Sequence, residues 1–306
     1  MTKQTDSSTY HSGFVPIAGR PNVGKSTLIN ALLGQPIAAV SPRPQTTQKQ
    51  QLGILTMDNA QVIFVDTPGI HHPVHKLGEQ MNAAAKEAIE DGDLVLVLFD
   101  LSAPPGEEDL QLRDSLLALD PAPPMLVALT KLDLVPEDRL SDRRAVFQAL
   151  LPDTPVLTVS TRLPDTLTTL IDAIVERLPE GPRYYPEEDI TTTYSRDIAA
   201  DIIRAACLRL LHQEVPYCIA VRIDEFKERT NGLYIAATLF VERDSQKGIV
   251  IGKGGSMLRS IGTEARKEIE DALQTRLYLD LHVKVMKNWR NDVEALKRFG
   301  YIRSDT

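Results

Sequence analysis

Two glycines, a lysine and a serine near the start of the chain have the spacing of a phosphate-binding loop. The stretch GRPNVGKS fits the pattern G-x-x-x-x-G-K-[ST] at Gly19, Gly24, Lys25 and Ser26. The apolar run FVPIA precedes it and the helix-like run TLINALL follows it, which is the setting that the motif requires. Glycines let backbone N–H groups converge on phosphates, and the start of a helix attracts negative charge. We therefore expect Lys25 to neutralise the β- and γ-phosphates of a nucleotide and Ser26 to ligate Mg²⁺.

A second motif supplies a carboxylate for the same metal ion. DTPG at Asp66–Gly69 follows the apolar run QVIFV, so Asp66 stands at the end of an expected strand. From there Asp66 can hold Mg²⁺ through a water molecule, and the Gly69 N–H can contact the γ-phosphate. Its position after the phosphate loop favours a nucleotide site over a simple turn.

Two further motifs indicate which base is bound. TKLD at Thr130–Asp133 follows the run MLVAL, and the Asp133 carboxylate can accept two hydrogen bonds from guanine, whereas adenine presents an acceptor there. Lys131 would pack its stem over the base, and the backbone of Ser160 and Thr161, after PVLTV, could contact the base oxygen. Four motifs in this order predict hydrolysis of GTP. The residues predicted to bind nucleotide are Gly19, Arg20, Pro21, Asn22, Val23, Gly24, Lys25, Ser26, Thr27, Asp66, Thr67, Pro68, Gly69, Ile70, Thr130, Lys131, Leu132, Asp133, Ser160 and Thr161.

The elements that must hold these motifs form an alternating pattern. Between residues 14 and 178, short apolar runs alternate with amphipathic stretches, including expected helices at 76–91, 107–119 and 138–150. Such alternation is typical of a doubly wound α/β domain, with a parallel sheet covered by helices on both faces.

A second domain is expected after the proline-rich segment PEGPRYYPEEDI at 179–190. The pattern predicts a helix at 195–212, two strands within 217–228 and 232–243, a helix ending near residue 273, a third strand at 276–285 and a terminal helix near 291–298. Composition alone assigns the run GIVI, residues 248–251, to a strand.

Charge is distributed unequally between the two parts. The net charge is −8, with 15 basic against 26 acidic residues up to Asp189 and 19 against 16 after it. An acidic front and a basic rear favour different partners, the second of them a polyanion. The chain lacks an apolar run long enough to span a membrane and has no signal-peptide pattern at its start, and its two cysteines, Cys207 and Cys218, are expected to be buried thiols.

These motifs resemble those of the translation-factor-like GTPases, and within them the bacterial Era family, over nearly the whole chain from Gly13 to about Ile302. The resemblance implies a P-loop GTPase domain at 13–180 after a disordered start at 1–12, a linker at 181–193, and a smaller α+β type II KH domain at 194–306. It also implies that GIVI ends a short helix. This chain has Thr130 where the family often has Asn, Thr161 where it often has Ala, and Gln48 where Arg is frequent.

The resemblance also suggests how the phosphate is cut. Thr47, with Thr46 as the alternative, would close on Mg²⁺ and the γ-phosphate, so that Ser26, Thr47 and Asp66 are the metal site. Ile70 stands where related enzymes carry a glutamine that orients water, and an isoleucine cannot do so. In relatives with such a residue an asparagine of the phosphate loop helps to bind K⁺, and Asn22 matches it. We therefore expect slow intrinsic hydrolysis with Asn22, Lys25, Thr47 and Gly69 as its catalytic residues and K⁺ as an activator besides Mg²⁺.

An RNA-binding loop is expected in the second domain. Gly252–Gly255 has the G-x-x-G spacing, and the resemblance to a KH domain implies that an RNA backbone passes close to it while apolar neighbours, Ile261 among them, hold four unpaired bases. The predicted RNA-binding residues are Ile251, Gly252, Lys253, Gly254, Gly255, Leu258, Arg259, Arg266 and Lys267.

The family resemblance implies a monomeric cytoplasmic switch that binds the 3′ region of 16S rRNA and assists maturation of the 30S ribosomal subunit. A weak association with the inner face of the cell membrane belongs to the same expectation. Two alternatives stay open at this point: a phosphoryl-transfer kinase with the same phosphate loop, and a scaffold whose basic tail binds a membrane surface or a protein. The cluster His71, His72 and His75 beside the phosphate site is read as part of a polar loop, because no carboxylate or cysteine completes a metal spacing.

Overall fold

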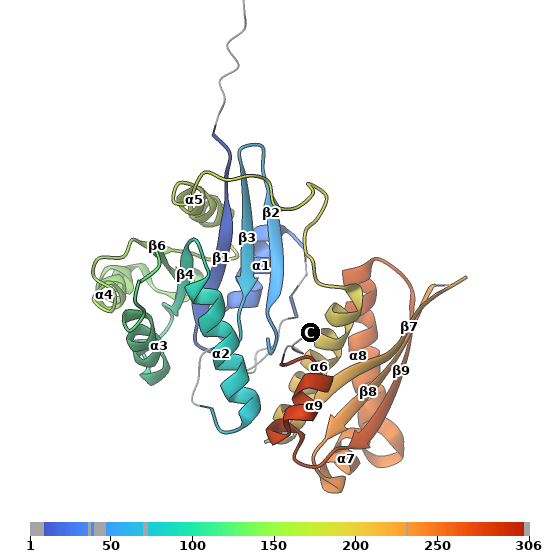
Figure 1. The fold of residues 1–306 in the computed structure, drawn as a ribbon. Coiled ribbons are helices and arrows are strands. Elements are labelled where there is room, and N and C mark those ends of the chain that lie inside the picture. Colours follow the sequence, from blue (N-terminus) through green and yellow to red (C-terminus); the bar gives the residue numbers. More distant parts are fainter. Residues whose placement is uncertain (1–8, 36–37, 40–46, 70–72, 231, 303–306) are drawn as a thin grey trace, which may run out of the picture. The chain divides into compact units, whose positions relative to one another are not determined.

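A computed structural model describes residues 9–35, 38–39, 47–69, 73–230 and 232–302 (Figure 1). The chain divides into two compact units. The first unit contains residues 1–34, 51–66 and 86–192, and the second contains residues 35–50, 67–85 and 193–306. The segments that carry Thr47 and Gly69 therefore group with the carboxyl-terminal part of the chain, although sequence motifs assign both to the GTPase domain.

A six-stranded sheet forms the centre of the first unit, in the order β2-β3-β1-β4-β5-β6. The pairs β1–β3, β1–β4, β4–β5 and β5–β6 are parallel, as the alternating pattern predicts. Every residue of VLVLFD in β4 is buried, which is the result of helices on both faces. The strands are β1 (His11–Gly19), β2 (Gln51–Thr56), β3 (Ala60–Asp66), β4 (Val95–Asp100), β5 (Met125–Thr130) and β6 (Val156–Thr158).

Strand β2 is the element that sequence reasoning missed. It pairs antiparallel with β3, from Gln51 opposite Asp66 to Thr56 opposite Gln61, and the turn at 57–59 joins the two strands. In this region we assigned roles only to Thr46 or Thr47 and no element to QQLGI, although the short polar turn after it is a hairpin signal. The first unit is thus a parallel sheet with one antiparallel edge strand.

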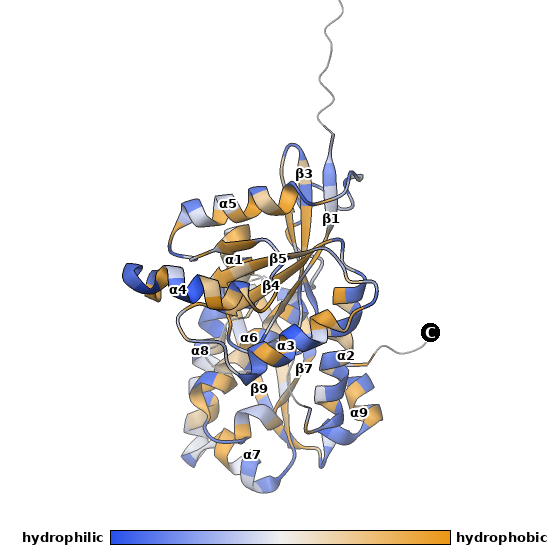
Figure 2. Ribbon diagram, turned by 90° about the vertical axis from the view of Figure 1, so that its left-hand side faces the viewer, coloured by the Kyte–Doolittle hydropathy of each residue, from blue (hydrophilic) through white to orange (hydrophobic). Residues whose placement is uncertain are grey.

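Helices pack around this sheet, with α1 behind strands β1, β3 and β2 and α3 at the lower left near β4 in Figure 1. Figure 2 shows apolar strands β4 and β5 inside helices whose outer sides are hydrophilic. Because parallel strands end at the same sheet edge, Gly19, Asp66, Asp100 and Thr130 come to one side of the unit. The helices are α1 (Lys25–Leu33), α3 (Glu107–Leu117), α4 (Glu137–Gln148) and α5 (Pro164–Val175), while α2 (Lys76–Glu90) begins in the second unit and ends in the first.

The two ends of the first unit are held by the sheet. Residues 1–8 of the expected disordered start lie outside the described residues, but His11 and Ser12 already belong to β1 and pair with Ala60 and Gln61. In the linker, the backbone N–H groups of Tyr184 and Tyr185 donate to the Gln61 side chain at 2.8 and 3.0 Å. The expected linker therefore lies along the first unit for part of its length.

The second unit is built on a three-stranded sheet of order β7-β8-β9. Strands β7 and β8 form the predicted antiparallel hairpin, and β8 and β9 run parallel because α7 and α8 connect them. The order α–β–β–α–α–β is the type II KH arrangement implied by the resemblance. Its elements are α6 (Ser195–Leu210), β7 (Ala220–Arg229), β8 (Gly232–Val241), α7 (Asp244–Ile251), α8 (Ser256–Leu273), β9 (Leu277–Val285) and α9 (Val293–Arg298).

The run GIVI lies in α7, so the reading of it as a strand from composition alone was wrong and the family resemblance was right. Val250 is fully buried, whereas Ile249 is half exposed. A helix can bury Val250 and expose its neighbour Ile249. Apolar composition alone does not show whether apolar residues repeat with the period of a helix or of a strand.

Two apolar clusters stabilise the second unit. The larger lies between α6, α8 and the inner face of the sheet, and it includes Cys207 and Ile261, both fully buried. The smaller is centred on Trp289, whose indole N–H donates to the Cys218 carbonyl oxygen at 2.9 Å, and it includes Leu77 and Met81 of α2. Both cysteines are buried free thiols, as predicted, and burial raises the pKa of the Cys207 thiol to about 12.

Candidate functional site

The phosphate loop of the first unit joins β1 to α1 with the predicted geometry. Gly24, immediately before the helix, has φ of +109°, a conformation that side-chain-bearing residues rarely adopt. Lys25 is 7% exposed, and its Nζ donates to the carbonyl oxygens of Gly19 and Arg20 at 3.0 and 3.1 Å. The lysine ammonium group is thus held inside the loop by the backbone that would surround a phosphate. Asn22 is exposed on the same loop with φ of +61°.

Burial lowers the pKa of Lys25 from 10.5 to about 8, with Asp66 opposing this change and Arg20 adding to it. The difference corresponds to a cost of about 3 kcal/mol for keeping the ammonium group charged in this position. Phosphate oxygens would offset that cost, because an adjacent negative charge favours the protonated lysine. The loop is therefore built to gain stability from an anion.

The predicted magnesium ligands of the first unit come together. Ser26 Oγ donates to Asp66 Oδ2 at 2.8 Å, and the Asp66 side chain is almost fully buried at the end of β3. A hydroxyl and a carboxylate that lie within hydrogen-bond distance of each other supply the oxygen ligands that Mg²⁺ prefers. The residues present fit the metal ion.

An unpredicted carboxylate links the phosphate loop to the base side of the site. Asp100, the last residue of β4, accepts from Arg20 at 3.2 Å and from Lys131 Nζ at 2.6 Å, while Arg20 also pairs with Asp109 at 3.2 Å. Burial alone would raise the pKa of Asp100, but hydrogen bonds from Lys131 and Ser102 outweigh it and lower the pKa. The available signal was a carboxylate ending the fully apolar run LVLVLF.

The guanine motif has its predicted aspartate in place. Ser160 Oγ donates to Asp133 Oδ1 at 2.6 Å, and Arg162 lies 3.3 Å from Asp133 Oδ2. We expected only the backbone of Ser160 to act, so the role of its hydroxyl in orienting the carboxylate is new. Lys131 has φ of +62°, which turns the chain sharply between β5 and Asp133.

Thr130 has a structural role that explains its presence in a position where asparagine is common. Its hydroxyl donates to the Val23 carbonyl at 2.9 Å and is 3.2 Å from the Phe99 carbonyl, and the residue is 7% exposed. The hydroxyl thereby fixes the phosphate loop against β4 and β5.

Of the other predicted nucleotide contacts, Pro21, Thr27, Leu132 and Thr161 lie in the first unit, and the rest belong to the second unit or lie outside the described residues. Thr47, Thr67 and Gly69 are described, but they group with residues 193–306, where Tyr301 Oη donates to Gln48 Oε1 at 2.7 Å. Ile70, Thr46, His71 and His72 are outside the described residues. The described residues contain no group of three or more histidine, cysteine, aspartate or glutamate side chains placed to hold a metal ion.

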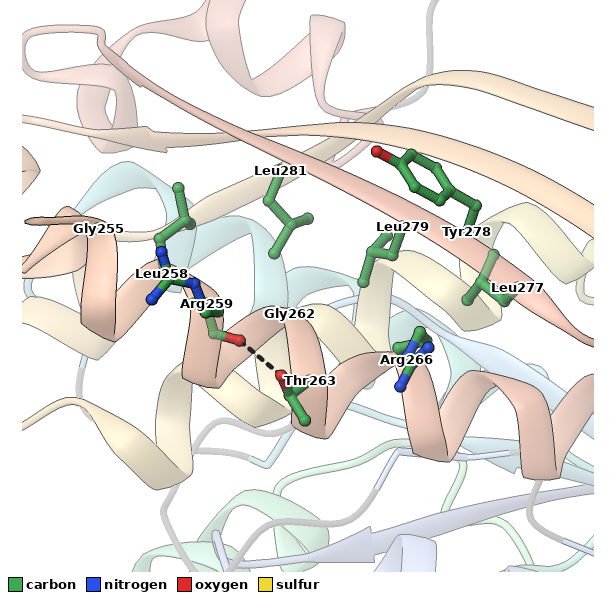
Figure 3. Close-up of a pocket in the computed structure, with 10 residues that line it drawn as sticks. All are labelled: Gly255, Leu258, Arg259, Gly262, Thr263, Arg266, Leu277, Tyr278, Leu279 and Leu281. Carbon is green, nitrogen blue, oxygen red and sulfur yellow. Dashed lines mark hydrogen bonds between the residues drawn. The ribbon is translucent and has the colours of Figure 1, made fainter.

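A groove of about 390 Å³ in the second unit lies beside the G-x-x-G loop (Figure 3). Four of the predicted RNA-binding residues line it, namely Gly255, Leu258, Arg259 and Arg266. Gly252 and Gly254 have φ of +71° and +62°, and at Gly254 an added Cβ would meet nothing within 4 Å. The loop backbone at Gly254 is therefore open to a partner, and its positive φ restricts which residues suit this position.

Other predicted residues are arranged differently. Ile251 packs partly against the main core and Ile261 lies wholly within it, so Ile261 does not line the groove as expected, and Lys267 is not among the lining residues. The opposite wall is formed by residues that sequence reasoning missed, Leu277, Tyr278, Leu279 and Leu281 of β9. Leucine at every second position of β9 was the available signal, because such residues share one face of a strand. Trp289 is a packing anchor, fully buried away from the groove lining.

Family models match both parts of the chain. Residues 14–131 match the 50S ribosome-binding GTPase family, and residues 214–290 match the KH domain family. No helix among the described residues is long and apolar enough to cross a membrane.

Full-length relatives and solved structures are also similar. GTPase Era of Geotalea daltonii is 41% identical over 302 residues, which cover 98% of this chain and all of the relative. GTPase Era of Geobacter metallireducens is 44% identical over 294 residues, covering 95% and 98%. The crystal structure of Era with MgGDPNP and nucleotides 1506–1542 of 16S ribosomal RNA is 35% identical, with a TM-score of 0.89 and coverage of 95% and 99%. A point variant of Aquifex aeolicus Era bound to GDP and AlF4⁻ gives a TM-score of 0.88 at the same identity and coverage.

Proposed function

We propose that this chain, which belongs to the GTPase Era family, is a switch that uses GTP to control RNA binding by its KH domain. The chain is a GTPase that works with Mg²⁺ and guanine nucleotide. Its RNA partner, its site residues and the coupling between the two domains are part of the same proposal. The observation that carries it is the presence in one chain of an Asp133 carboxylate held by Ser160, as guanine recognition requires, and a KH groove with an open G-x-x-G loop.

Each side chain of the nucleotide site has a proposed task. Lys25 exchanges its two backbone partners for the β- and γ-phosphate oxygens of GTP, and Asp133, oriented by Ser160, selects guanine. Ser26 and Asp66 would hold Mg²⁺, with Thr47 as the further ligand, and the metal would supply charge neutralisation at the phosphates. The Gly69 N–H is proposed to contact the γ-phosphate.

For hydrolysis we propose that Asn22, exposed on the phosphate loop, helps to bind K⁺, because the chain lacks a water-orienting glutamine at position 70. The intrinsic rate is then slow. Water attacks the γ-phosphorus, the bond to the β-phosphate oxygen breaks, and GDP and phosphate leave.

The proposed RNA partner is the 3′ region of 16S rRNA, because a similar solved protein holds nucleotides 1506–1542 of that RNA. The groove would take unpaired bases between α8 and β9, with the loop at Gly252–Gly255 against the backbone and Arg259 and Arg266 close to phosphates. Through this contact the chain would assist maturation of the 30S subunit in the cytoplasm as a monomer. The proposal also includes a weak peripheral contact with the inner face of the cell membrane.

Grouping of the 35–50 and 67–85 segments with the KH domain supports the coupling. Both segments are predicted to respond to the γ-phosphate, and both share a compact unit with residues 193–306. Tyr301 holds Gln48, the residue after Thr47, by one hydrogen bond of 2.7 Å. Movement at Thr47 would therefore be felt directly by the carboxyl-terminal segment.

RNA affinity in two nucleotide states tests the proposal. An RNA ending in single-stranded 16S sequence should bind the full chain more tightly with a non-hydrolysable GTP analogue than with GDP, measured by fluorescence anisotropy. Gly254→Asp should weaken binding, because a carboxylate would face the RNA backbone, whereas Gly248→Asp on the exposed side of α7 places the same charge away from the groove. Equal affinity in both nucleotide states and in both variants would sink the proposal.

A further inference from the structure

A column of one cation and two aromatic rings lies on the sheet of the second unit. The Arg229 guanidinium carbon is 3.9 Å from the centre of the Tyr234 ring, and the Tyr234 and Tyr278 rings are stacked at 5.7 Å with 14° between their planes. Such contacts are favourable because the cation faces the negative side of the ring and the offset rings bury apolar area. The column is thus an ordered arrangement of flat groups.

Strand pairing explains both how the column forms and why one of its ends is open. Tyr234 on β8 is the direct register partner of Tyr278 on β9, and their neighbours Leu233 and Leu277 are buried on the other face of the sheet. β9 is the edge strand of this sheet. Tyr278 is 67% exposed, although a residue with a stacked ring would be expected to lose more surface. Its exposed side is therefore directed past the edge of the sheet, while its other side faces Tyr234.

The open end of the column adjoins the KH groove. Tyr278 contributes to the groove lining together with Leu277 and Arg266, and Figure 3 shows its ring on the side of β9 away from α8. From Gly255 to Arg266 the α8 wall of the groove is about 16 Å long, which suits about four nucleotides. A strand that fills the groove and continues past Leu277 would meet the Tyr278 ring next.

Arginine side chains lie near both ends of the column. Arg266 and Arg276 line the adjoining hollow together with Glu270 and Asp271, and the Glu270 carboxylate already accepts the Leu277 N–H at 2.9 Å. Arg229 caps the column at its other end.

We infer that the exposed ring of Tyr278 stacks on an unpaired RNA base just outside the groove, extending the Arg229–Tyr234 column by one layer. This inference rests on the proposed function, because it assigns a further position to the same RNA. An aromatic ring accepts the flat face of any base, so the position adds affinity and reach with little sequence preference. Tyr234 and Arg229 act by holding the Tyr278 ring in place.

Probes of different length separate this contact from binding in the groove. The first is a four-nucleotide single-stranded RNA from the 3′ end of 16S rRNA, and two others extend it by three nucleotides on its 5′ or its 3′ side. Binding to the full chain is followed by anisotropy, with NMR titration for the shortest probe. A second set carries 2-aminopurine at each added position, because its fluorescence falls when it stacks. The variants are Tyr278→Leu, which keeps an apolar side chain at this exposed position, and Tyr278→Phe, which keeps the ring.

One extended probe should bind Tyr278→Leu about tenfold more weakly than the unchanged protein, within the range for loss of one base–aromatic stack. The four-nucleotide probe should lose clearly less affinity than the extended probe, because the Tyr278 ring lies on the side of β9 away from α8, and Tyr278→Phe should match the unchanged protein. One 2-aminopurine position should be quenched by the unchanged protein and by Tyr278→Phe but not by Tyr278→Leu.

Failure here is distinguishable from failure of the proposed function. If Gly254→Asp weakens binding of the short probe while Tyr278→Leu alters neither affinity nor quenching of the extended probes, the stacking inference is overturned and the groove remains. Equal weakening of short and extended probes by Tyr278→Leu also overturns it, because the ring would then act within the groove. If the short probe does not bind, or binds Gly254→Asp equally well, the proposed function itself is overturned.

Discussion

Nucleotide binding should draw a proton onto Lys25 at mildly alkaline pH. In the nucleotide-free protein burial lowers the pKa of Lys25 to about 8, so about half of the molecules carry a charged ammonium group at pH 8. When GDP binds, phosphate oxygens replace the Gly19 and Arg20 carbonyls around Nζ and raise the pKa again. The bound state therefore holds the proton more tightly than the free state.

The size of the effect follows from that pKa. Binding should take up about 0.1 proton per GDP at pH 7, about 0.5 at pH 8 and about 0.8 at pH 8.5. GDP affinity should be full below pH 7 and should fall about twofold by pH 8 and about fourfold by pH 8.5, because only the protonated lysine binds phosphate well. The direction of the pH dependence follows from the lowered pKa of Lys25 in the free protein: binding weakens as the pH rises through that pKa.

Titration calorimetry in two buffers with different ionisation enthalpies measures this uptake directly, with excess Mg²⁺ present and the pH kept between 7 and 8.5. Ser160→Ala changes the guanine side and leaves the Lys25 contacts in place, so its affinity should drop while its proton uptake rises with pH in the same way. Uptake that stays near zero across this range would refute the view that the loop holds a partly neutral lysine.

Three further outcomes are expected. Thr130→Val should lower the free energy of unfolding by about 1–3 kcal/mol in urea and weaken GDP binding, because the Val23 carbonyl loses its buried donor, whereas Thr130→Ser should stay close to the unchanged protein; equal stability of all three would contradict this. Asp133→Asn should bind GDP about 100-fold more weakly and shift preference toward xanthosine diphosphate, as competition binding would measure, and an unaltered guanine preference would count against the assignment. GTP hydrolysis should be on the order of tenfold faster with K⁺ than with Na⁺, and Asn22→Ala should remove the difference in a phosphate-release assay; a salt effect that survives the substitution would exclude Asn22 as the cause.

Motif spacing predicted much of the guanine site because local backbone rules determine it. A glycine-rich turn between a strand and a helix can be read from GRPNVGKS alone, and the side chains of Lys25, Ser26, Asp66 and Asp133 lie where that reading requires. Asp100 could not be assigned in this way. Its partners Arg20 and Lys131 are 80 and 31 residues away, and only the sheet brings the three together.

The fold of the second unit shows the same limit. Alternation predicted β9, but the importance of its leucines emerged only when pairing placed β9 at the sheet edge beside α8. The run GIVI was ambiguous, since apolar composition does not distinguish a strand from a helix with one buried side. In the first unit β2 was missed because its residues directly follow the segment of Thr47. That segment was interpreted by its expected contact with the γ-phosphate and not by its secondary structure.

The position of Asp100 between Arg20 and Lys131 makes the two halves of the nucleotide site thermodynamically interdependent. One carboxylate is the counter-ion of both Arg20 in the phosphate loop and Lys131 in the TKLD motif, so substitutions on the two sides should not have additive free energies. A substitution that loosens the grip on guanine will also change how the phosphate loop is held, and the reverse. If the proposed roles of Arg20 and Lys131 hold, base selection and phosphate binding share Asp100, so neither property is expected to change during evolution without affecting the other.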